Sequence, residues 1–181
     1  TTFFNLLSGH LEATSGLIFF GGRDVSRYSN YKRARLGLGR SFQVTNVFPD
    51  LTAFENVRVA VQATKTTFAW WRRALSYAEI NRRAVVLLEQ VGLADRQDVE
   101  AGTRAYGDER YLEVGIALAS EPSLLHLEEP TAGMRPEESR RTAGFIKELA
   151  NRVDIILVEH DMEVVMNISD CVTCMHEGEV I

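Results

Sequence analysis

The fold of this chain is decided by two stretches, Ser123-Leu-Leu-His-Leu-Glu-Glu-Pro-Thr-Ala-Gly-Met134 and Asp154-Ile-Ile-Leu-Val-Glu-His160. Each contains a short apolar run typical of a buried strand. The residues between them open with Pro136 and two glutamates, then carry Phe145, Ile146 and Leu149 on one helical face. This pattern predicts a strand, a helix and a second strand. A right-handed crossover would make the two strands parallel.

Three side chains that can take part in acid–base or ligand chemistry lie at the ends of these strands. Glu128 and Glu129 end the first strand, and His160 follows the second. The carboxyl edge of an open α/β sheet is where ligands usually bind, so we expect a functional site at this edge. The alternative is that these are ordinary solvated strand ends.

Two further motifs lie upstream of these strands, Arg40-Ser-Phe-Gln43 and Ala105-Tyr-Gly-Asp-Glu-Arg110. They precede Thr131-Ala-Gly-Met134, which ends the first of the two stretches quoted above. With them the chain resembles, from Thr1 to Ile181, the nucleotide-binding subunit of ABC transporters, most closely the branched-chain amino acid importer branch. The resemblance implies one α/β domain of the P-loop NTPase type over residues 1–181, with a helical subdomain at 57–118 and without the first strands and most of the phosphate loop.

The composition agrees with one soluble α/β domain. The chain has 181 residues, of which 45% are hydrophobic and 25% charged. A formal net charge of -5 argues against general nucleic-acid binding. A local basic run has the spacing of a solvated helix face, with a phosphate or partner surface as the less favoured alternative. Its members are Arg27, Lys32, Arg33, Arg35 and Arg40.

The two cysteines, Cys171 and Cys174, form a single Cys-x-x-Cys in an apparent strand, which favours packing over zinc binding or redox chemistry.

No apolar run approaches the roughly 20 residues that span a bilayer, so we expect a cytosolic chain unless a partner anchors it. The first residues form an apolar helical pattern that Gly9 can end. Because the chain starts inside this helix without a methionine, we expect that it has lost what preceded Thr1.

The resemblance assigns phosphate and metal contacts. Thr1 and Thr2 match the final positions of a phosphate loop, where Thr1 would hold Mg²⁺ and Thr2 would contact a phosphate. Taken alone, the two threonines indicate only a helix N-cap. Gln43 stands where relatives place the glutamine that senses Mg²⁺ and the attacking water, although by itself it would be an ordinary surface residue.

Glu129 resembles the catalytic base that polarises water for attack on the γ-phosphate of ATP, and His160 the histidine that contacts this phosphate. Glu128 stands where relatives carry an aspartate that binds Mg²⁺ through water. Its extra methylene predicts slow hydrolysis, because magnesium demands near-octahedral geometry. His126, inside the same strand, is expected to be a hydrogen-bonded core histidine that costs stability.

The signature motif of the family is matched in part. Tyr106, Gly107 and Asp108 stand at its centre, and Ala105 replaces its serine. In the family this motif caps the γ-phosphate bound by a second subunit in a head-to-tail dimer. The loss of a hydroxyl donor at Ala105 predicts weaker capping that still uses the Gly107 amide.

Three functions compete at this point. The first is an ATPase subunit that binds ATP and Mg²⁺ and dimerises with an identical or different ATPase subunit. It would drive transmembrane permease subunits at the inner face of the cell membrane, in the import of branched-chain or related amino acids. The second is a degenerate or fragmentary domain that does not hydrolyse ATP. The third is an ABC ATPase with another task, such as lipid export or soluble mechanical work, since the motor motifs do not specify cargo.

Overall fold

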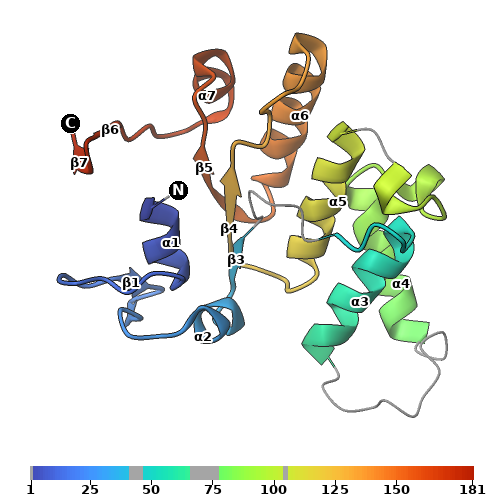
Figure 1. Cartoon of the computed structure of the whole chain (residues 1–181), viewed down its shortest axis with the longest axis horizontal. Helices are drawn as coiled ribbons and strands as arrows, with labels where there is room; N and C mark the ends of the chain where they lie inside the picture. The colour runs from blue at the N-terminus through green and yellow to red at the C-terminus, as the bar shows by residue number, and fades with distance from the viewer. Residues whose placement is uncertain (1, 41–46, 66–77, 104–105) are drawn as a thin grey trace.

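The computed structural model describes residues 2–40, 47–65, 78–103 and 106–181. The elements are α1 (Thr2–Ser8), β1 (Phe19–Phe20), β2 (Arg23–Asp24), α2 (Asn30–Arg35), β3 (Leu38–Arg40), α3 (Ala53–Lys65), α4 (Ala78–Gln90), the 3-10 helices η2 (Ala94–Arg96) and η3 (Ala101–Thr103), α5 (Tyr106–Leu118), β4 (Leu124–Glu128), α6 (Pro136–Leu149), β5 (Asp154–Val158), α7 (Met162–Ile168), β6 (Met175–His176) and β7 (Glu179–Val180). Helices α3, α4 and α5 follow one another between strands β3 and β4, whereas strand and helix alternate from β4 to α7 (Figure 1).

The predicted strand–helix–strand unit is present. The strands β4 and β5 pair in parallel from Leu124↔Asp154 to Glu128↔Val158, and α6 connects them. The strand β3 pairs in parallel with the other edge of β4, so the sheet order is β3-β4-β5. The strand β3 begins at Leu38, and Ser41 and Phe42 of the Arg40-Ser-Phe-Gln43 motif lie outside the described ranges.

The two faces of β4 have different roles. Leu125 and Leu127 are fully buried in the main apolar core, together with residues of α5 and α6. His126 and Glu128 alternate with them, and side chains alternate between the two faces of a strand. The ring of His126 stacks on Phe4 of α1 with centroids 4.8 Å apart. The helix α1 thus covers one face of the sheet, while α5 and α6 cover the other (Figure 1).

The helices α3, α4 and α5 pack against one another beside the sheet. Buried residues of all three belong to the same core cluster as Leu125 and Leu127. The helical stretch begins at Ala53, before the predicted Val57, and the subdomain boundaries at 57–118 stay a prediction. Within the described residues, no helix has both the length and the hydropathy to span a bilayer.

Two sequence expectations are wrong. Arg33 is only 2% exposed and the Arg40 side chain 9%, so these members of the basic run do not lie on a solvated face. Their guanidinium groups are buried because carbonyl, amide, hydroxyl and carboxylate oxygens accept their hydrogen bonds. Conversely, Cys171 and Cys174 are exposed rather than packed. They precede a two-residue strand that pairs with β7 and lies outside the parallel sheet.

His126 is expected to make the protein acid-sensitive. Burial, reinforced by the positive charge of Arg40, lowers the pKa of His126 from 6.5 to about 4. The unfolded chain therefore binds more protons than the folded chain between pH 6.5 and 4. The free energy of unfolding should fall by about 3 kcal/mol as the pH drops through this window. Urea denaturation of the nucleotide-free protein at several pH values measures this change.

The variant His126→Leu should lose this pH dependence and gain stability at low pH, because leucine takes up no proton. His176→Leu, at an exposed histidine of β6, is the matched control and should keep the wild-type profile. If the free energy of unfolding had the same pH dependence in His126→Leu as in the wild type, His126 would not be its cause.

Candidate functional site

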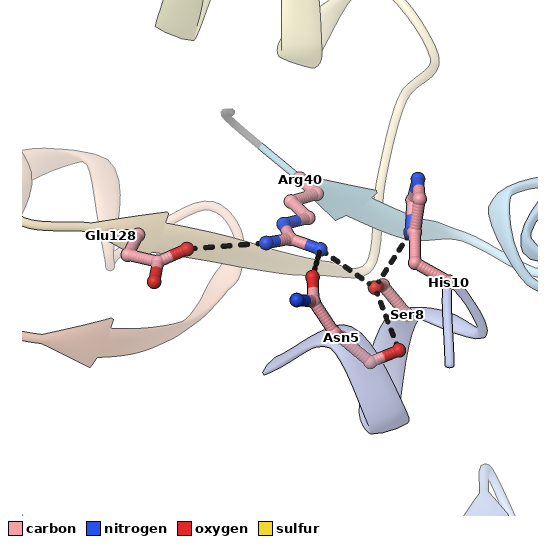
Figure 2. A network of polar contacts seen from close by, with 5 residues as sticks. All are labelled: Asn5, Ser8, His10, Arg40 and Glu128. Carbon is pink, nitrogen blue, oxygen red and sulfur yellow. Dashed lines mark hydrogen bonds and ion pairs between the residues drawn. The ribbon is translucent and has the colours of Figure 1, made fainter. Parts of the chain in front are cut away.

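A buried ion pair holds the end of β4. The Glu128 side chain is 1% exposed, and its Oε2 lies 3.2 Å from Nη2 of Arg40 at the end of β3. The other terminal nitrogen of Arg40, Nη1, donates to Asn5 Oδ1 at 2.7 Å and to Ser8 Oγ at 2.9 Å, both on α1. Figure 2 shows the guanidinium between the carboxylate on one side and α1 on the other. Arg40 therefore connects three elements through one planar group.

The same network continues to the end of α1. Ser8 Oγ lies 2.9 Å from Nδ1 of His10 and 3.4 Å from the backbone oxygen of Asn5, to which it donates (Figure 2). Partial burial, and then the charge of Arg40, lowers the pKa of His10. Because Ser8 has one hydroxyl hydrogen, which it donates to Asn5, Nδ1 of His10 is the donor of the contact with Ser8 Oγ. Burial and the nearby guanidinium favour the uncharged form of His10.

Glu129 has an unusual backbone. Its φ is 46°, in the left-handed region, where a residue with a Cβ is strained. Its N–H donates to the backbone oxygen of Val158 at 2.8 Å, and its own oxygen accepts from the N–H of Ala132 at 3.1 Å. These bonds hold the strained turn directly after β4. Strained residues that the surroundings enforce are concentrated at functional sites.

Glu159 is a site residue that the sequence analysis missed. Its side chain is fully buried, and its Oε1 accepts from the backbone N–H of Thr131, at 3.0 Å, and from the Thr131 hydroxyl. Its Oε2 accepts from the backbone N–H of His160 at 3.1 Å. The carboxylate therefore fixes the loops after β4 and β5 to each other. The available signal was a charged residue ending an apolar strand directly before His160.

The predicted edge residues gather as expected, but their exposure differs. Glu128 is buried at the end of β4, whereas the side chain of His160 is 73% exposed after β5. His160 borders a pocket of about 540 Å³ that also involves α6 and α7. Thr2 is the exposed first residue of α1. The expectations for Thr1, Gln43 and Ala105 fall outside the described residues.

The predicted signature residues lie elsewhere. Tyr106, Gly107 and Asp108 form the first turn of α5. Asp108 makes an ion pair with Arg96, and the space beside the Gly107 Cα is open. Because α5 and α1 cover opposite faces of the sheet, this turn lies across the sheet from α1 (Figure 1).

Comparison with known proteins identifies the family. Residues 1–132 match the ABC transporter family. LivG of Salmonella typhimurium, a high-affinity branched-chain amino acid transport ATP-binding protein, is 36% identical over 98% of this chain and 73% of its own length. BraF of Pseudomonas aeruginosa, which has the same description, is 35% identical with the same coverage. This chain therefore belongs to the ABC transporter family.

Solved structures agree on the fold. The ADP conformation of MJ1267, an ATP-binding cassette of an ABC transporter, superposes with a TM-score of 0.84 at 24% identity, over 99% of this chain and 73% of that one. CbiO1 of Clostridium perfringens, part of the transporter complex cbiONQ, has a TM-score of 0.84 at 25% identity and is covered to 70%. The chain has the ABC ATPase fold that the sequence predicted.

Proposed function

We propose that this chain is the ATPase subunit of an importer for branched-chain or related amino acids. The observation that carries the proposal is its identity of about 35% with LivG and BraF over 98% of the chain. Both of those proteins are named for branched-chain amino acid transport. The positions of Glu128, Glu129 and His160 at one sheet edge support the catalytic half of the proposal.

Glu128 would be the carboxylate side chain of the protein that binds Mg²⁺. Magnesium in phosphate-transfer sites is bound by one or two carboxylates together with substrate phosphates and water, so this donor is of a fitting type. Thr1 and Gln43 would supply the remaining protein contacts. The metal would neutralise the charge that develops on the phosphates during hydrolysis. The side chain of Glu128, one methylene longer than aspartate, makes an ion pair with Arg40 at 3.2 Å.

Glu129 would act as the general base, and the bonds to Val158 and Ala132 fix its backbone. His160 would contact the γ-phosphate, since its side chain is exposed and can reach a ligand. The backbone N–H of His160 donates to Glu159, which holds the backbone in place. Thr2 would contact a phosphate at the start of α1.

The subunit would dimerise and work with permease subunits. The turn formed by Tyr106, Gly107 and Asp108, with Ala105 before it, would cap the nucleotide of a second ATPase subunit. This agrees with its place on the other side of the sheet from α1 (Figure 1). Transmembrane permease subunits would hold the dimer at the cytoplasmic face of the membrane.

Uptake of radiolabelled leucine by a strain that lacks the gene tests the proposed cargo. Expression of the complete reading frame should restore uptake, and the purified protein should hydrolyse ATP in the presence of Mg²⁺. Nucleotide binding without hydrolysis would favour the degenerate domain. Hydrolysis without any effect on amino acid uptake would favour another cargo, and co-purification with lipid-export components would identify that alternative.

A further inference from the structure

We propose that Arg40 is a positioning residue, which sets the orientation of the Glu128 carboxylate by fastening β4 to α1. The inference rests on the proposed role of Glu128 toward Mg²⁺. It concerns a residue outside the predicted set of catalytic and phosphate-binding positions. Its consequence is that the affinity for Mg²⁺ depends on a side chain that does not itself touch the metal.

The burial of the pair is the first argument. The side chains of Arg40 and Glu128 are 9% and 1% exposed, so both charges are largely removed from water. Desolvation makes such a pair a poor source of stability, and well-packed apolar residues often replace one without loss. A buried pair next to the strained turn at Glu129 is therefore better explained by the orientation it imposes than by the stability it adds.

The geometry of the guanidinium is the second argument. Nη2 binds Glu128, while Nη1 binds Asn5 and Ser8, so the two ends of a rigid plane are fixed on different elements. Figure 2 shows the second carboxylate oxygen of Glu128 directed away from Arg40. A lysine ammonium is a point charge on a flexible stem and cannot reproduce this fork. Arg40 therefore transmits the position of α1 to the carboxylate.

The test measures metal dependence by binding, not by turnover. The protein is expressed from its complete reading frame, and a fluorescent N-methylanthraniloyl ADP is titrated first in EDTA and then with increasing Mg²⁺. Arg40→Met should raise the half-saturating Mg²⁺ concentration about tenfold, as is typical when an outer-shell partner of a metal ligand is lost. Nucleotide affinity in EDTA should stay within about twofold. Arg40→Lys should recover only part of the loss.

Asn5→Ala provides a milder variant in case Arg40→Met does not fold. It leaves the ion pair between Arg40 and Glu128 intact but removes one of the hydrogen bonds that hold Arg40 to α1. The half-saturating Mg²⁺ concentration is therefore expected to rise about threefold. Arg35→Met, at an exposed arginine of α2, is the control and should not shift the Mg²⁺ titration. No shift in folded Arg40→Met, or in Asn5→Ala if the former is unfolded, would overturn the proposal.

Glu128→Gln separates the two proposals. If it raises the Mg²⁺ requirement while Arg40→Met does not, the role of Glu128 stands and that of Arg40 is wrong. If Glu128→Gln has no effect, the metal role of Glu128 is wrong and the positioning role is overturned with it. In the double variant, Arg40→Met should add little to Glu128→Gln, because the oriented carboxylate is already gone.

Discussion

Replacing Glu129 by glutamine is expected to lower the rate of ATP hydrolysis at least about 100-fold, since general-base catalysis contributes roughly 10²- to 10⁴-fold. Glutamine has nearly the same shape but cannot take a proton from water. The bonds from Val158 and Ala132 to the Glu129 backbone do not involve the side chain, so the turn should persist. Steady-state phosphate release with saturating Mg²⁺-ATP measures the loss, and ATP affinity should change little.

Glu177→Gln is the matched control for this experiment. Glu177 is also a glutamate in the left-handed region, with φ 49°, but it lies in the exposed turn between β6 and β7. Turnover should equal that of the wild type. An unchanged rate in Glu129→Gln would mean that another group activates the water.

Replacing Arg33 by methionine is expected to lower the free energy of unfolding by about 3–5 kcal/mol, since a hydrogen bond from a charged donor contributes about 1.5–3 kcal/mol and several are lost together. Nη1 of this arginine donates to the backbone oxygens of Leu6 and Leu7, both at 2.7 Å. Nε donates to the oxygen of Tyr28 and Nη2 to that of Ser26, each at 3.0 Å. Methionine keeps the apolar stem but leaves these carbonyls without their donors. Urea denaturation gives the free energy.

Arg35→Met is again the control, because Arg35 lies on the same helix but is exposed and stacks over the ring of Tyr31 at 4.8 Å. Its loss should cost no more than about 1 kcal/mol. Equal effects of the two substitutions would show that Arg33 does not fasten α1 to α2. A Cβ at Gly9 would lie 3.0 Å from Nε of Arg33, so Gly9→Ala should also destabilise this junction.

Local patterns were sufficient for the main α/β unit. The apolar run before Glu128 predicted β4, and Pro136 with its following glutamates predicted the start of α6. Gly9, with φ 80°, follows the last residue of α1 as predicted. The placement of Glu128 and Glu129 after one strand and of His160 after its parallel neighbour was confirmed. The roles of these residues, and of Gln43 and Ala105, stay predictions.

The sequence by itself determined the strand–helix–strand order, the parallel pair of strands and the sheet edge that Glu129 and His160 follow, because these depend on periodicity and on neighbours in the chain. Only the tertiary structure decided which charges are buried. Arg33 binds carbonyls up to 27 residues away, and Arg40 binds a carboxylate 88 residues away. A basic residue is solvated unless folding brings such oxygens to it, and its local spacing contains no information about partners that distant.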